Sequence, residues 1–273
     1  MFNEQPSSEK IVAFEAQRDD LKLLAQEGAQ KFFSTEFPDL KHAFLPKLEC
    51  VVCIDEGTAH KDLTGEAKFC LAGSGILFPA QNEAERIGKV AKLMIDLGIT
   101  DITSHSGCGA AGLAYKRDFS DAKPTSQDIE NYAIAWSQKL ADKINELQYE
   151  AAHSHITIDE MMRPAEFHNA RVVYFDGAGG FNPDKEIDLP MGFVIERKFV
   201  PADYAVEELK VAVSIAFGHH GLGELFTKDE PFVIVVFASS VEELEKLIQE
   251  AKNVLSDNEF YLAGRIKIDG MVV

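Results

Sequence analysis

The chain lacks the features that mark secreted and membrane-spanning proteins. It has four cysteines in 273 residues, too few for the disulfide framework of a secreted protein of this size. Its longest apolar run, residues 232–238, is far too short to span a bilayer. The polar N-terminal stretch has no apolar core of the kind found in signal peptides. These absences favour a cytoplasmic location.

Positive charge is also scarce. Lysine and arginine together number 27 against 45 aspartate and glutamate residues, which gives a formal net charge of −18. A field of this sign repels the phosphates of nucleic acids and the headgroups of anionic lipids. We therefore expect no nucleic-acid partner and no membrane partner. A small neutral molecule would be indifferent to the field, so a small-molecule substrate fits the composition best.

The residues that are plentiful predict a folded α/β protein. Hydrophobic residues make up 46% of the chain, enough for a substantial core. Strand-like apolar runs alternate with amphipathic helical stretches, which is typical of a mostly parallel central sheet flanked by helices. The expected strands are 48–54, one within 69–78 that is interrupted by Gly73 and Gly75, 99–104, 170–175, 193–199, 231–239 and, at a sheet edge, 262–273. The expected helices are 8–37, 81–97, one that begins at 107–112, a long one within 124–152, 202–216 and 240–255.

The sequence contains no repeat, no low-complexity tract and no obvious linker. We therefore expect residues 1–273 to form a single α/β domain. Within it, residues 1–40 form an N-terminal helical arm and residues 41–190 form the core that carries the candidate site. Residues 191–273 form an α/β C-terminal extension of that core.

Two short motifs carry residues that indicate metal chemistry. His105 and Cys108 lie three residues apart, where a predicted strand leads into a helix rich in glycine and alanine. Cys53 and Asp55 lie two apart at the end of another strand, so their side chains share a face. Two thiolates and an imidazole suit zinc, and a carboxylate beside them is either a fourth ligand or a partner for bound water. Because parallel strands end at one sheet edge, we expect a Zn²⁺ site there.

The other cysteines and histidines fit structural or surface roles better. Cys50 lies three residues before Cys53 and faces the other side of the strand, so this C-x-x-C pair is a weak metal or redox motif. Cys50 and Cys70 are expected to be buried small hydrophobic residues. For His60, a proton-shuttle role and a surface position stay equally open. Solvated or packing roles are expected at His153, His155, His219 and His220.

Three segments resemble the motifs of β-class carbonic anhydrases. They are Cys53-Ile54-Asp55, Ala72-Gly73-Ser74-Gly75 and His105-Ser106-Gly107-Cys108-Gly109-Ala110. The similarity spans residues 48–115, and nothing after residue 191 supports it. The resemblance implies an α/β fold of that family and a homodimer or higher homo-oligomer.

The same resemblance implies a reaction. Cys53, His105 and Cys108 would bind Zn²⁺, and Asp55 would be the catalytic acceptor of the proton from the bound water. The protein would then be a zinc-dependent lyase that interconverts CO₂ and bicarbonate through zinc-bound hydroxide.

One position departs from the family pattern. The family motif is C-x-D-x-R, in which the arginine holds the aspartate away from the metal, and this chain has Gly57 at that place. Without the arginine, Asp55 is expected to turn onto the zinc and close a Cys₂-His-Asp site, unless Arg86, Lys61 or Lys68 replaces it. A closed site is inert in hydration. The departure therefore keeps two alternatives open: a zinc hydrolase acting on carbonyl sulfide, carbon disulfide or an ester, and a non-catalytic zinc-stabilised binding or regulatory protein.

Overall fold

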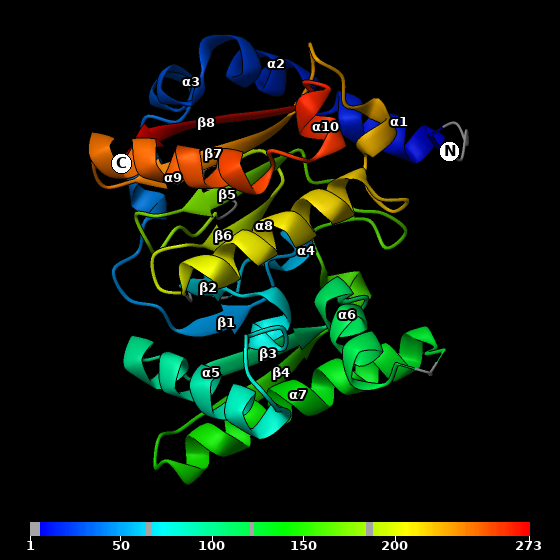
Figure 1. Ribbon diagram of the computed structural model, residues 1–273, viewed down its shortest axis with the longest axis vertical. Coiled ribbons are helices and arrows are strands. Elements are labelled where there is room, and N and C mark those ends of the chain that lie inside the picture. The colour runs from blue at the N-terminus through cyan, green and yellow to red at the C-terminus, as the bar shows by residue number, and fades with distance from the viewer. Residues whose placement is uncertain (1–5, 64–66, 121–122, 184–187) are drawn as a thin grey trace. The chain divides into compact units, whose positions relative to one another are not determined.

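The structure is a computed structural model that describes residues 6–63, 67–120, 123–183 and 188–273. It contains two four-stranded sheets, both parallel throughout and both flanked by helices (Figure 1). The expected α/β class with parallel strands is therefore confirmed. None of the described helices is both long enough and apolar enough to cross a membrane.

The chain divides into two compact units where a single domain is expected. The first unit is Leu45–Met162, and the second joins Met1–Phe44 to Arg163–Val273. A core at 41–190 with an extension at 191–273 does not match this division, because the C-terminal residues build a sheet of their own. Residues of the N-terminal segment are bound to that sheet, as in the hydrogen bond from Ala29 N–H to Asp269 Oδ2.

The first unit is built on a sheet with the strand order β2-β1-β3-β4. Helix α7 packs on β3 and β4, and α5 and α6 pack against α7 (Figure 1). Because the strands are parallel, the carboxyl ends of β2, β1 and β3 lie side by side at one edge of the sheet. The strands are β1 (Cys50–Val52), β2 (Lys68–Cys70), β3 (Asp101–His105) and β4 (Ala152–Ile156). The helices are α4 (Glu56–Ala59), α5 (Glu83–Leu97), α6 (Gly109–Asp118) and α7 (Ser126–Glu146), with 3₁₀ turns η2 (Ala72–Gly75) and η3 (Ile158–Glu160).

Helix boundaries in this unit follow local capping. Gly98, with φ 74°, ends α5 in the left-handed conformation typical of a C-cap glycine. A capping box formed by Thr125 and Asp128 begins α7. The long helix expected within 124–152 is α7, after which the chain turns and enters β4. The segment His153-Ser154-His155 lies on that strand.

Glycine shortens a predicted strand beside the candidate site. The interruption expected at Gly73 and Gly75 is confirmed: β2 is followed by the 3₁₀ turn η2, because Gly73 (φ 53°) and Gly75 (φ 86°) adopt positive φ values that a strand does not contain. The segment between β1 and β2 contains the short helix α4. Three residues of that segment, 64–66, lie outside the described part of the chain.

The second unit repeats the strand order of the first. Its sheet has the order β6-β5-β7-β8, and β8 is an edge strand as expected. Helix α9 covers one face, where Leu244 lies against Gly270, and α2 and α3 cover the other, where Lys267 donates to the carbonyl of Ala25. The strands are β5 (Val172–Asp176), β6 (Gly192–Glu196), β7 (Phe232–Ala238) and β8 (Ile266–Val272). The helices after β5 are α8 (Ala202–Phe217), α9 (Val241–Val254) and α10 (Glu259–Leu262), with the 3₁₀ turn η4 (Gly223–Leu225).

Three helices replace the single helix expected at 8–37. They are α1 (Ser8–Glu15), α2 (Arg18–Glu27) and α3 (Ala29–Glu36), followed by the 3₁₀ turn η1 (Leu40–Ala43). The chain bends at Gln17 and again at Gly28, whose φ of 85° breaks the helical path. Leu24 and Phe33 are both fully buried, and the ring of Phe33 packs against the rings of Tyr174 and Phe237 in the second sheet. The N-cap of α1 is Ser7, whose hydroxyl accepts from Lys10 N–H.

Candidate metal centre

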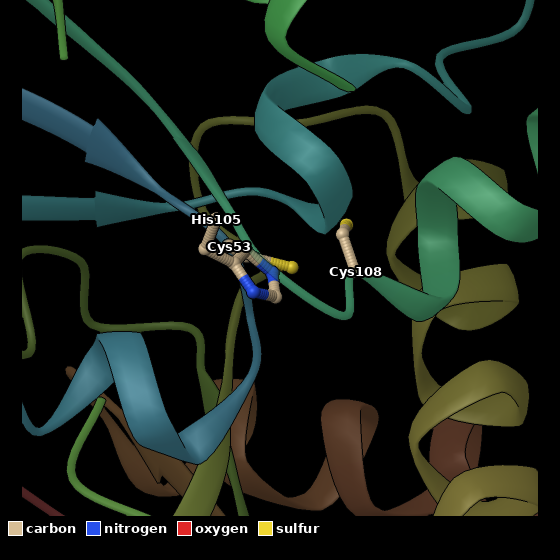
Figure 2. A group of neighbouring side chains, drawn as sticks. All are labelled: Cys53, His105 and Cys108. Atoms are coloured by element: carbon tan, nitrogen blue, oxygen red, sulfur yellow. The ribbon is translucent and has the colours of Figure 1, made fainter. Parts of the chain in front are cut away.

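Three of the predicted ligands meet at the carboxyl edge of the first sheet. The sulfur atoms of Cys53 and Cys108 and a ring nitrogen of His105 all lie within 4.8 Å of one another (Figure 2). Cys53 follows β1, His105 is the last residue of β3, and Cys108 is the N-cap of α6. The three residues are 2–4% exposed. Neighbouring strands thus bring together two motifs that are far apart in the sequence, and this group could hold a metal ion.

The hydrogen bonding of His105 leaves one nitrogen available to a metal. Its Nδ1 lies 2.9 Å from the carbonyl oxygen of Ser106. A carbonyl oxygen can only accept, so Nδ1 carries the hydrogen and the neutral ring has its lone pair on Nε2. That Nε2 is buried and has no hydrogen-bond partner among the described residues. A buried orphan nitrogen beside two sulfur atoms fits a metal ligand.

Backbone N–H groups support the two sulfur atoms. Cys53 Sγ accepts from Gly73 N–H at 3.2 Å, and Cys108 Sγ accepts from Ala111 N–H at 3.5 Å in the first turn of α6. The hydrogen bond between the two thiol groups lowers the pKa of Cys108, and the same bond together with burial raises the pKa of Cys53 well above its usual value. Cys108 is therefore the more acidic of the two thiol groups.

The imidazole also holds a proton when no metal is bound. Burial acts to lower the pKa of His105, but attraction to Cys53, with contributions from Asp55 and the Ser106 carbonyl, outweighs it and raises the pKa to about 9. A metal ion must displace such protons, because it binds a neutral imidazole and thiolates. The ligand set is therefore sensitive to pH.

A glycine turn lies against the ligands. Gly73 belongs to η2 and has φ 53°, and a Cβ at this position would lie 2.8 Å from Ile76 Cγ2 and 3.4 Å from Cys108 Sγ. A side chain would thus be strained and would crowd the ligands. Trp136 Nε1 donates to Ser74 O at 3.1 Å and holds the turn against α7. The sequence indicates this segment only through the family resemblance, and nothing in it signals the N–H bond to sulfur.

Asp55 has a different position from the other predicted ligands. It is the N-cap of α4, and its Oδ1 accepts from Gly57 N–H at 2.8 Å. Among the described residues it is not part of the group formed by Cys53, His105 and Cys108. Its negative charge still acts on that group, since it contributes to the raised pKa of His105. Asp55 therefore lies near the ligands while its carboxylate caps a helix.

The basic residues considered as replacements for the missing arginine contact backbone carbonyls. Arg86 Nε donates to Phe78 O at 2.9 Å, and its guanidinium lies over the ring of Trp136. Lys68 Nζ donates to Ala59 O and to the carbonyl of Lys61. Lys61 Nζ donates to Glu160 O at 3.0 Å.

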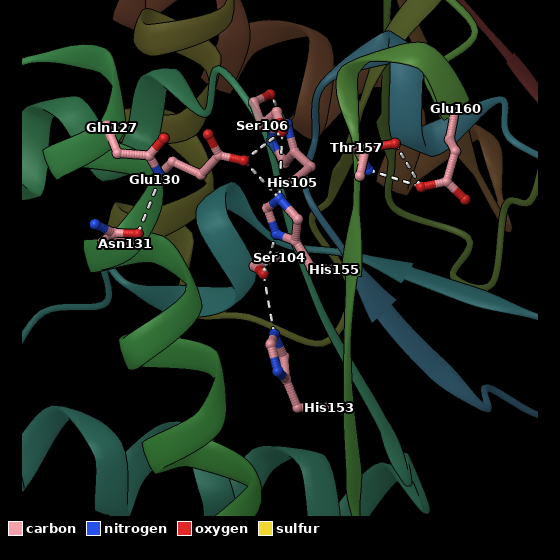
Figure 3. Close-up of polar contacts among 10 residues, drawn as sticks. All are labelled: Ser104, His105, Ser106, Gln127, Glu130, Asn131, His153, His155, Thr157 and Glu160. Atoms are coloured by element: carbon pink, nitrogen blue, oxygen red, sulfur yellow. Dashed lines mark hydrogen bonds and ion pairs between the residues drawn. The ribbon is translucent and has the colours of Figure 1, made fainter.

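Sequence reasoning missed the polar residues that surround His105. Ser104, Ser106, Glu130, His153 and His155 form a hydrogen-bonded network beside it (Figure 3). The spacing of the two histidines was a usable signal, because residues two apart on a strand share one face. That signal depends on recognising β4 as a strand, and its polar sequence does not resemble one.

No protein-family model, curated protein or solved structure matches this chain. The arrangement of the side chains therefore carries the functional argument.

Proposed function

We propose that this protein is a zinc-dependent lyase of the carbonic anhydrase type that interconverts CO₂ and bicarbonate. The observation that carries the proposal is the buried group of Cys53, His105 and Cys108, in which His105 Nε2 has no hydrogen-bond partner among the described residues. Two thiolates and one imidazole are a donor set of catalytic zinc sites, and three protein ligands leave a fourth position open.

A zinc ion held by these ligands would supply Lewis acidity, lowering the pKa of a coordinated water toward about 7. The chain provides the rest. The N–H groups of Gly73 and Ala111 draw negative charge from the two sulfur atoms, so less of it is donated to the metal. We assign proton acceptance to the carboxylate of Asp55, whose orientation is fixed by Gly57 N–H.

The hydrogen bond between Asp55 and Gly57 supports an open site over a closed one. For the carboxylate to become a fourth ligand, it would have to give up its role as the N-cap of α4. Loss of an N-cap costs about 1 kcal/mol, so losing the hydrogen bond to Gly57 N–H opposes the closed arrangement. This favours hydration chemistry over the zinc-stabilised, non-catalytic alternative.

The proposal is tested by zinc content and CO₂ hydration measured on the same preparations. We expect the wild-type protein to bind one zinc per chain and to accelerate hydration in stopped-flow assays. Cys108→Ser is expected to lose the metal and the activity. Cys50→Ser is the matched control, because Cys50 is a buried cysteine in β1 outside the ligand group.

Two results would contradict the proposal in different ways. Equal zinc content in the wild type and Cys108→Ser would remove the metal site. A zinc-loaded protein that matches buffer at every pH would keep the site but exclude CO₂ hydration, and carbonyl sulfide, carbon disulfide and ester substrates would then be assayed.

A further inference from the structure

One imidazole is bonded to both neighbours of His105. His155 Nδ1 lies 2.8 Å from Ser104 Oγ, and His155 Nε2 lies 3.2 Å from Ser106 Oγ (Figure 3). The strand register places it there, since Ser104 in β3 pairs with His155 in β4. A single side chain thus holds the backbone before and after the histidine ligand.

A carboxylate from α7 completes this arrangement. Glu130 Oε1 accepts from Ser106 Oγ at 2.6 Å and lies 2.9 Å from His155 Nε2. The bond from the Ser106 hydroxyl, together with the one from His155, outweighs partial burial and lowers the pKa of Glu130. The carboxylate is therefore ionised at neutral pH and can only accept hydrogen bonds.

An ionised Glu130 can only accept, so His155 Nε2 donates to it. With its hydrogen on Nε2 alone, the ring of His155 accepts at Nδ1 from the hydroxyl of Ser104. The Ser104 oxygen then accepts from His153 Nε2, 3.0 Å away. Burial and the neighbouring His155 lower the pKa of His153, which agrees with a neutral ring. These donor and acceptor roles are mutually consistent, and a consistent polar network holds its members in place.

The network reaches the metal ligand through Ser106. The carbonyl of Ser106 accepts from His105 Nδ1, while its hydroxyl is bonded to Glu130. We propose that Glu130 and His155 are positioning residues for His105. By fixing Ser106, they select the ring form with hydrogen on Nδ1 and orient Nε2 toward the two sulfur atoms. The inference rests on the metal site of the proposed function, and it does not depend on the substrate.

The order serine–histidine–carboxylate also occurs in hydrolases, where the serine is the nucleophile. That role does not fit Ser104. It is 5% exposed, it lies within β3, and its hydroxyl is bonded to two imidazoles. A substrate carbonyl cannot approach an oxygen in this position, so the network acts on its neighbour His105.

The test compares zinc affinities, measured by competition with a chromophoric chelator at fixed pH. Removing groups that orient a metal-bound histidine typically weakens metal binding about 10–100-fold, and we expect a loss of this size for Glu130→Ala and His155→Phe. Glu130→Gln keeps a neutral acceptor and is expected to recover part of the affinity. Cobalt substitution supplies a second signal, since displacement of His105 would change the visible absorption of the bound cobalt.

Glu160→Gln is the matched control for Glu130→Gln. Glu160 is also bonded to a hydroxyl, that of Thr157 at 2.8 Å, but it caps η3 and, among the described residues, has no hydrogen bond to the network (Figure 3). We expect its zinc affinity and cobalt spectrum to equal those of the wild type.

Folded Glu130 and His155 variants with unchanged zinc affinity and cobalt spectrum would overturn the inference. A wild type that binds no zinc would overturn it together with the metal site. Weaker zinc binding in these variants, in a protein that does not hydrate CO₂, would support the inference and reject only the proposed reaction.

Discussion

The two sheets share a strand order, yet their carboxyl edges carry different chemistry. In the first sheet, the ends of β1 and β3 present Cys53 and His105. In the second sheet, β5 and β6 end at Asp176 and Glu196, which are paired in the strand register. The same topology thus presents sulfur and imidazole at one edge and carboxyl groups at the other.

The surroundings of the carboxyl groups at the second edge favour their protonated form. Asp176 accepts from Gly179 N–H at 2.8 Å and from Phe181 N–H at 2.9 Å, which ties down the loop after β5. Burial raises the pKa of Asp176 to about 6, and burial followed by repulsion from Asp176 raises the pKa of Glu196 well above its usual value. Neither oxygen of the Glu196 carboxyl group has a hydrogen-bond partner among the described residues.

The comparison shows that the fold determines where the residues at the edge lie. The chemistry of their side chains determines what they can bind. Among the described residues, Asp176 and Glu196 belong to no group of three closely spaced metal ligands. A raised carboxyl pKa means that a proton neutralises the second edge. At the first edge, a metal ion can take the place of the protons.

The largest expected difference between the two edges is the pH dependence of zinc binding at the first. In the metal-free protein the pKa of His105 is about 9, and the pKa of Cys53 is well above its usual value. His105 therefore holds a second ring proton at neutral pH and must release it to bind zinc, so affinity is expected to fall at least about 10-fold for each pH unit lost. Chelator competition between about pH 6 and pH 8 would measure this slope. A change in affinity of less than about 10-fold per pH unit, which means release of less than one proton, would contradict the ligand assignment.

A smaller effect of opposite sign is expected at the second edge. With its pKa raised from an ordinary 3.8 to about 6, Asp176 binds a proton more strongly in the folded unit than in the unfolded chain. Its contribution to stability is complete below about pH 4 and is lost as the pH rises through 6, a change of about 3 kcal/mol. Asp176→Asn is expected to flatten this dependence, as measured by urea unfolding followed by circular dichroism.

The tryptophan provides an internal control for that measurement. Trp136, the chain's single tryptophan, is buried in the first unit, so its fluorescence follows that unit. We expect Asp176→Asn to leave the fluorescence transition unchanged. A pH dependence identical to that of the wild type in the circular dichroism transition would reject the role assigned to Asp176.

The smallest effect concerns the glycine turn at the first edge. Gly73→Ala places a methyl group 2.8 Å from Ile76 at positive φ, and we expect the first unit to lose about 2–3 kcal/mol of stability and some zinc affinity. Gly98→Ala is the matched control, because its φ is also positive but no atom lies within 4 Å of the added methyl group. It is expected to lose only about 1 kcal/mol, with zinc binding unchanged. Equal losses of stability and of zinc affinity in Gly73→Ala and Gly98→Ala would show that a side chain at residue 73 does not disturb the metal site.

Much of the fold and the ligand set followed from local sequence patterns. Buried parallel strands are continuous apolar runs, and Phe232–Ala238 is recognisable as a strand without any knowledge of its neighbours. The meeting of Cys53, His105 and Cys108 could be predicted because their motifs lie at strand ends. The position of Asp55 could not, because the competing hydrogen bond from Gly57 forms only once α4 exists.

The features that sequence reasoning missed depend on distant partners. The apolar stripe at 8–37 fits one helix, and only the second sheet reveals why the chain bends at Gln17 and Gly28. Strand β4 is polar because its histidines are bonded to Ser104 and Glu130, so its sequence lacks the apolar alternation of a typical strand. The division into two units likewise cannot be predicted from the amino-acid composition along the chain.

The discontinuity of the second unit has a consequence for synthesis on the ribosome. The inserted unit, Leu45–Met162, can assemble as soon as its own residues have emerged. Helices α2 and α3 must wait for β8, to which they are bonded through Ala29 and Lys267. At about 5–20 residues per second, the wait lasts on the order of 10–50 s. During that time Leu24 and Phe33 lack the sheet that buries them in the finished protein, so a nascent chain exposes apolar side chains that chaperones recognise.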